Sequence, residues 1–168
     1  LDNSDDHSIP DQFFQILERA VMANIKVEQE MLIYALESHG EMQWYLDKLT
    51  GDIFPVAEFS IDDDDELAEQ VEEYPNRFIA IEPIFSHESF EIMESYIATL
   101  NNREVIDTLS EAISKRHPFR NFKDALCQFE EMRENWFKFH NEAMLQKAKE
   151  WLRGEEIDAT IEEYRRHD

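Results

Sequence analysis

The chain has 168 residues, of which 42% are hydrophobic and 12% aromatic, so it is not a fully disordered chain and suits one domain with its own core. Its 39 acidic and 16 basic residues give a formal net charge of −23, and a field of this sign repels nucleic acid and anionic lipid. A single cysteine excludes an intramolecular disulfide. No apolar run approaches the roughly 18 residues of a membrane span, and no secretory signal pattern is visible. We therefore expect an acidic cytoplasmic protein that binds neither nucleic acid directly nor a membrane.

The acidic residues are unevenly distributed along the chain. Residues 1–75 contain 20 acids and 3 bases, whereas residues 76–168 contain 19 acids and 13 bases. Residues 1–8 are polar and are expected to form a disordered tail, followed by a single globular domain over residues 9–168. Such a charge favours solubility, and it also suits recognition of a basic protein, including by imitation of nucleic acid.

Helical periodicity dominates the first 40 residues. Apolar side chains recur at helical spacing in residues 11–21, just after Pro10, and again in residues 27–39. Both segments are predicted to be helices. Gly40 is expected to cap the second helix at its C-terminal end.

The pattern then changes to that of strands. Aromatic and β-branched residues lie on both sides of Thr50-Gly51-Asp52, which predicts a β-hairpin at about 43–58 with Gly51 at positive φ. Pro55 cannot donate a ladder hydrogen bond, so the second strand should lie at an edge. A short apolar run predicts a third strand at about 77–82. The acidic loop at about 60–66 lacks the alternating ligands and the glycine of a calcium loop, and it is expected to lead into a short helix.

The remainder of the chain reads as helical. Helices are predicted at 86–100 with Ser86 as its cap, at 103–116, from Pro118 onward, and at about 131–153. Gly154 should end or kink the last of these, and residues 155–168 are predicted to form a short terminal helix or tail. The order of elements predicts an α+β fold, mostly helical, in which a small antiparallel sheet packs with several helices.

Five stretches in this order resemble one bacterial family. They are YLDKLTGDI, RFIAIEPI, SFEIMESYI, PFRNFKDAL and WFKFHNEAMLQKAKEWL, and together they cover about residues 44–152. The chain is similar to the uncharacterised protein family 0158. The resemblance implies a small bacterial cytoplasmic protein, and it supplies no catalytic residue to carry over.

Basic and aromatic residues gather around Pro118. Lys115 and Arg116 fit the negative end of a helix, and Pro118 fits the first position of the next. Phe119 and Phe122 share the inner face of that next helix by their spacing. These bases are therefore predicted to fasten two helices.

Arg120 and Lys123 have no such explanation, because positive charge in the first turn of a helix is mildly unfavourable. Arg120 can pair with Asp124 four residues later. The alternative is that Arg120, Lys123 and Arg116 hold an anion at the helix N-terminus. We therefore take Arg116, Arg120, Lys123, Trp136 and His140 as candidate contacts for an anion or a partner.

Other reactive side chains give weaker signals. His140 is expected to be a boundary histidine with a backbone partner, and Cys127 a buried, inert thiol. His87 and Glu91 are one turn apart, but two ligands do not make a metal site. We assign no catalytic residue, no cofactor and no metal.

The functional hypothesis is a non-enzymatic binding or regulatory module that recognises a protein partner, possibly a basic one, through an acidic face and aromatic patches. Trp44, Tyr45, Trp136 and Trp151 are aromatics that could mark an interface if exposed, and Phe137 lies opposite the inner stripe of its helix. One alternative is an enzyme of unknown type with an anion-binding pocket near Arg120 and Lys123. The other is an acidic mimic of nucleic acid that binds a basic protein.

Overall fold

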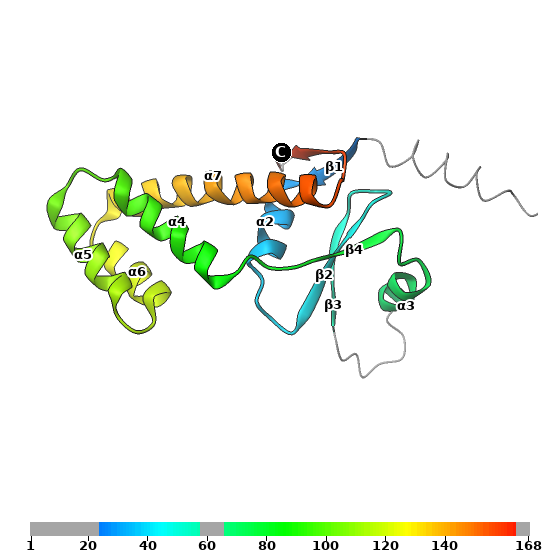
Figure 1. The fold of residues 1–168 in the computed structure, drawn as a ribbon, viewed down its shortest axis with the longest axis horizontal. Coiled ribbons are helices and arrows are strands. Elements are labelled where there is room, and N and C mark those ends of the chain that lie inside the picture. Colours follow the sequence, from blue (N-terminus) through cyan, green and yellow to red (C-terminus); the bar gives the residue numbers. More distant parts are fainter. Residues whose placement is uncertain (1–23, 58–65, 164–168) are drawn as a thin grey trace, which may run out of the picture.

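The computed structural model describes residues 24–57 and 66–163, and Figure 1 shows most of the helices toward one side and a small sheet with one short helix at the other. The elements in chain order are β1 (Ile25–Glu28), α2 (Gln29–Glu37), β2 (Met42–Asp47), β3 (Ile53–Ala57), α3 (Glu66–Glu73), β4 (Phe78–Ile81), α4 (Ser86–Thr99), α5 (Arg103–Ser114), α6 (Pro118–Leu126), α7 (Glu130–Gly154) and β5 (Ala159–Glu162). This is an α+β fold that is mostly helical, as the sequence predicts.

The predicted hairpin and third strand are confirmed as one antiparallel sheet. Its strand order is β3-β2-β4, so the longest strand lies in the centre. Trp44 and Leu46 alternate with more exposed residues along β2 and point into the core. Pro55 lies in β3, which is an edge strand as predicted.

A second sheet of two parallel strands, β1 and β5, was missed by the sequence-based prediction. Ile25 pairs with Ala159 and Val27 with Ile161, so the two ends of the described chain meet. The predicted terminal helix or tail is therefore wrong at residues 159–162, which form β5. The helix predicted at 27–39 begins at Gln29, because Ile25 and Val27 alternate with polar residues and belong to a strand.

Helix α7 is the longest element, and α2 and α4 both pack against it (Figure 1). The α5–α6 pair lies toward the N-terminal half of α7 and far from the sheet. Tyr96 of α4 joins this end together, because its hydroxyl donates to the Met132 carbonyl at 2.7 Å and its ring meets those of Phe122 and Trp136 edge-on. The helical core is thus built on aromatic side chains.

Two predicted caps are wrong. Helix α2 ends at Glu37 with Ser38 as its C-cap, two residues before Gly40. Ser86 is the first residue of α4, and the N-cap is Phe85, whose N–H donates to the Glu88 carboxylate at 2.9 Å. Gly154 is the last residue of α7, as predicted.

Several predictions fall on residues that are not described. The tail at 1–8, the helix at 11–21 and the acidic loop at about 60–66 lie there, except that Glu66 begins α3. Over residues 24–57 and 66–163, none of the helices combines the length and the apolar character needed to cross a membrane.

Candidate functional site

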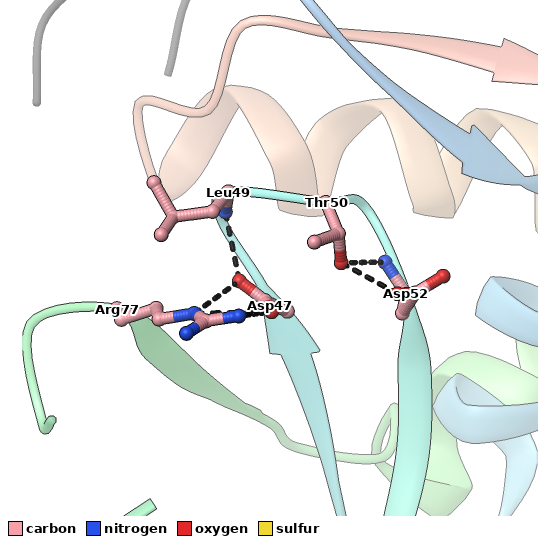
Figure 2. Close-up of polar contacts among 5 residues, drawn as sticks. All are labelled: Asp47, Leu49, Thr50, Asp52 and Arg77. Atoms are coloured by element: carbon pink, nitrogen blue, oxygen red, sulfur yellow. Dashed lines mark hydrogen bonds and ion pairs between the residues drawn. The ribbon is translucent and has the colours of Figure 1, made fainter. Parts of the chain in front are cut away.

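The turn between β2 and β3 is held by its own polar side chains (Figure 2). The Asp47 carboxylate accepts the Leu49 N–H at 2.8 Å, and the Gly51 N–H donates to the Asp47 carbonyl, also at 2.8 Å. Thr50 donates its hydroxyl hydrogen to Asp52 at 2.6 Å and accepts the Asp52 N–H at 3.2 Å. Gly51 has φ of 84°, as the hairpin pattern predicts, because a side chain is strained in that conformation.

Arg77, just before β4, clamps this turn to the rest of the sheet. Its Nε lies 3.0 Å from Asp47 Oδ1 and its Nη2 lies 2.5 Å from Oδ2, while its carbonyl accepts the Lys48 N–H. Asp47 is 4% exposed. Burial raises the pKa of Asp47, but hydrogen bonds from Arg77 and Leu49, together with the guanidinium charge, outweigh it and hold that pKa below its ordinary value. The carboxylate is therefore ionised and paired.

The turn also lies directly against β1. A Cβ added to Gly51 would be 1.9 Å from the Lys26 carbonyl oxygen, which is far inside van der Waals contact. Glycine is thus required at this position twice, for its positive φ and for the close approach of the Lys26 backbone. The contact fixes the distance between the antiparallel sheet and the β1–β5 pair.

A groove of about 1160 Å³ opens where these two sheets meet α2 and α7; we call it the β1–turn groove. Its lining residues come from β1, the start of α2, the turn, α7 and β5: Lys26, Val27, Glu28, Gln29, Met31, Gly51, Asp52, Ile53, Leu145, Lys149, Ile161, Glu162 and Glu163. Apolar side chains are mixed with charges of both signs. The site was not predicted from the sequence, because it depends on β1 and β5.

The basic residues around Pro118 lie elsewhere, and they do not line this groove. Pro118 begins α6, as predicted. Arg120 pairs with Asp124 at 3.8 Å, also as predicted, and both side chains are largely exposed. Lys123 and Arg116 are exposed and form no ion pair within residues 24–57 and 66–163.

The prediction that the basic side chains fasten α5 to α6 is wrong, because another side chain makes this link. The Asn121 side chain does so, since its amide donates to the carbonyls of Ala112 at 3.2 Å and Arg116 at 2.9 Å. Phe122 adds a ring that is 1% exposed, whereas Phe119, predicted to share the inner face, is 38% exposed.

The other two candidate contacts are not beside Arg120 and Lys123 in a common pocket. Trp136 is 8% exposed and packs among the aromatic rings, so it offers little contact surface. Among the described residues, the His140 side chain has no hydrogen bond to a backbone group, contrary to the prediction. Its Nε2 instead lies 2.8 Å from Glu37 Oε1, which links α7 to the end of α2.

Cys127 is exposed, contrary to the prediction, because it is the C-cap residue of α6 and follows the last inward turn. The described residues contain no group of three or more His, Cys, Asp or Glu side chains arranged to hold a metal ion. His87 stacks on Phe85 with ring centroids 5.5 Å apart.

Comparison with known proteins confirms the resemblance stated from the sequence and extends it. The model for the Uncharacterised protein family (UPF0158) matches residues 22–166. A UPF0158 protein of Pseudomonas aeruginosa is 26% identical over 136 residues, which are 81% of this chain and 87% of that protein. A UPF0158 protein of Chlamydia trachomatis is 25% identical over 129 residues, which are 76% of this chain and 39% of the chlamydial protein. No solved structure gives a significant match.

Proposed function

The chain belongs to the UPF0158 family, and from its own surface we propose that it is a non-enzymatic module that binds a protein partner. The observation that carries the proposal is a set of exposed aromatic side chains around the C-terminal end of α2. We call Tyr34, Phe85 and Phe137 the α2-end patch. Their exposed fractions are 60%, 69% and 56%, respectively.

Two contacts bring the three elements of the patch to the same place. The Ile84 N–H donates to the Leu36 carbonyl at 2.9 Å, which puts Phe85 beside the last turn of α2. The ion pair of His140 with Glu37 joins α7 to that same turn, and Phe137 lies one helical turn before His140. Tyr34 lies one turn before Glu37 on α2 itself.

Each ring of the patch contacts a neighbouring side chain, and each of the three residues keeps more than half of its surface exposed. Tyr34 meets Trp44 edge-on at 5.3 Å, Phe85 stacks on His87, and Arg133 lies over the Phe137 ring at 5.6 Å. Rings positioned in this way lose little conformational freedom when a partner covers them. Burying an exposed aromatic side chain contributes roughly 1.5–3 kcal/mol, which makes such residues typical anchors of an interface.

The charge around the patch supports a basic partner. Helix α2 carries Glu30 and Glu37 and no basic residue, and the exposed Glu41 and Glu82 lie in the segments that follow α2 and β4. With a net charge of −23 behind them, these carboxylates would accelerate association with a cationic surface. The aromatics would then supply most of the affinity.

Affinity capture from the native cell tests this function. The bait is the full chain, compared with the double variant Phe85→Ser/Phe137→Ser, and the control is Phe119→Ser, which removes an exposed aromatic from α6. We expect one protein to be captured by the wild type and the control and to be lost from the double variant. Circular dichroism should show the same helix content for all three chains.

Repeating the capture at high salt separates the contribution of the acidic residues from that of the aromatic side chains. Retention on wild-type bait at about 1 M salt would assign the affinity to the aromatics, because exposed charges are screened there over about 3 Å. A partner captured equally by wild type and double variant would rule out the α2-end patch as the interface. Capture of a nucleic-acid-binding protein that salt alone removes would favour the mimic instead.

A further inference from the structure

The β1–turn groove lies at the opposite end of α2 from the aromatic patch, where the helix begins. Gln29 is the first residue of α2, and the N-cap residue Glu28 makes no side-chain capping hydrogen bond. The first turn of a helix carries unpaired N–H groups and a partial positive charge. This end of α2 therefore favours a negatively charged group.

The Gln29 side chain points to a ligand independently of the helix end. Gln29 lines the groove and is 8% exposed, yet its amide makes no hydrogen bond with any part of the chain that the structure describes. The amide is not sealed inside the protein either, because the one described side-chain atom that is both fully buried and unpaired is Trp44 Nε1. The mostly buried Gln29 amide therefore keeps free hydrogen-bonding capacity at the lining of the groove, where a ligand could use it.

A cation faces the same space from α7. Lys149 lines the groove, and within residues 24–57 and 66–163 it has no ion-pair partner. Lys26 on β1 is already paired with Glu162 at 2.9 Å. Lys149, Gln29 and the start of α2 thus border the same groove and can act as donors to an anionic group there.

The rest of the groove suits a longer and oppositely charged molecule. Four acidic residues line it, namely Glu28, Asp52, Glu162 and Glu163, together with apolar side chains from β1, the turn, α7 and β5. Its volume of about 1160 Å³ exceeds the roughly 300–1,000 Å³ of small-molecule sites. An occupant with one anionic end, apolar groups and several cations would match this lining.

We propose that the β1–turn groove binds the C-terminal end of an extended basic peptide, with the terminal carboxylate received by Gln29, Lys149 and the first turn of α2. A terminal carboxylate adds one negative charge in total, so the peptide's basic side chains can still lie along Glu28, Asp52 and Glu163, while Glu162 stays paired with Lys26. This site is independent of the α2-end patch, and the two are affected by different substitutions.

Fluorescence polarisation with matched peptides tests the proposal. The probe is a pool of N-terminally labelled hexapeptides with two lysines followed by four randomised positions, prepared once with a free C-terminal carboxylate and once as the C-terminal amide. We expect the acid pool to bind at least about tenfold more tightly than the amide pool, since one charge-assisted contact of about 1.4 kcal/mol is lost. A third pool, amidated but with aspartate at the last position, distinguishes a terminal carboxylate from a side-chain carboxylate.

Substitutions in the groove complete the test. Lys149→Met and Gln29→Leu should each weaken binding of the acid pool by about fivefold or more, and should weaken binding of the amide pool clearly less. The matched control is Lys138→Met, which removes an exposed lysine of α7 that does not line the groove. Equal binding of acid and amide pools, binding of the aspartate pool as tight as that of the acid pool, or no binding at about 1 mM would overturn the proposal.

Discussion

The β2–β3 turn and the segment around Pro118, residues 115–123, which we call the Pro118 corner, stand out for different reasons. The corner stands out by its composition, and the turn by the burial of its charged residue. The corner concentrates bases and aromatic rings in an acidic chain, and its composition makes it the more conspicuous of the two in the sequence. Its Arg120 and Lys123 are nevertheless exposed, and the pair of Arg120 with Asp124 is long at 3.8 Å. The turn is less conspicuous in the sequence, yet it contains a buried carboxylate, Asp47, and a bidentate contact to Arg77.

The physical reason for the difference is solvent. Exposed charges in water interact weakly and exchange their partners for water at little cost. Asp47 is 4% exposed, so little water reaches its carboxylate to replace a lost guanidinium, and the carboxylate depends on its protein partners. We therefore expect substitutions in the turn to be severe and those in the basic corner to be mild.

The largest effect is expected at Gly51. In Gly51→Ala the new methyl group would collide with the Lys26 carbonyl, and φ of 84° is itself unfavourable for alanine. Strain of about 1–2 kcal/mol in the backbone and about 1–3 kcal/mol from overpacking add to a loss of roughly 2–5 kcal/mol. Urea unfolding followed by circular dichroism measures it.

Gly40 supplies the matched control for this measurement. A Cβ at Gly40 meets nothing within 4 Å, and Gly40 is not at positive φ. Gly40→Ala should be neutral or stabilising by up to about 1 kcal/mol, because it restricts the unfolded chain. Equal destabilisation by the two substitutions would contradict the close contact between the turn and β1.

The next effect is expected at Arg77. Arg77→Met leaves the Asp47 carboxylate buried without its partner, which costs roughly 3–5 kcal/mol for a fully buried pair. The Arg77 side chain is 33% exposed, so water can partly compensate, and we expect a smaller loss of roughly 2–3 kcal/mol at neutral pH. Urea unfolding of the variant and the wild type at neutral pH measures the loss.

The pH dependence of the unfolding free energy shows whether the loss in Arg77→Met comes from the unpaired Asp47 carboxylate. Because the folded-state pKa of Asp47 lies below the ordinary value of 3.8, its contribution to stability is complete above that value and is lost as the pH falls through the lowered pKa. In Arg77→Met, burial raises the pKa of Asp47 instead, so protonation at low pH relieves the variant. The gap in unfolding free energy between wild type and variant should narrow between about pH 6 and pH 3. A constant gap would mean that the loss comes from packing of the arginine stem.

The elements that could be predicted from the sequence are those with a local signal. The hairpin around Gly51 shows a change from helical to strand pattern, and α7 was predicted to within one residue at each end because its apolar stripe and Gly154 define it. Strand β4 was found from a single apolar run. Each of these signals lies within about one element of the chain.

The features that were missed depend on contacts between distant segments. Strands β1 and β5 have four residues each, and they pair across almost the whole chain. In both strands apolar residues alternate with polar ones, Ile25 and Val27 in β1 and Ala159 and Ile161 in β5. This alternation is the signal that could have indicated them. No sequence pattern singles out Asp47 and Arg77 as partners, because they are far apart in the sequence and a third of the residues in the chain are charged. The groove follows from these contacts and could not be predicted without them.

The smallest effects are expected within the Pro118 corner, where they distinguish the hydrogen-bonding Asn121 from the exposed bases. Asn121→Ala removes both hydrogen bonds that join α6 to α5 and to the Arg116 carbonyl just after it, and at about 0.5–1.5 kcal/mol each we expect a loss of roughly 1–3 kcal/mol. Arg120→Met removes only an exposed pair, so we expect less than about 0.5 kcal/mol, and less still at high salt. Thermal unfolding of the two variants at low and high salt provides the comparison. If Arg120→Met proved the more damaging, the bases would fasten the helices after all, and burial would no longer explain why the corner and the turn differ.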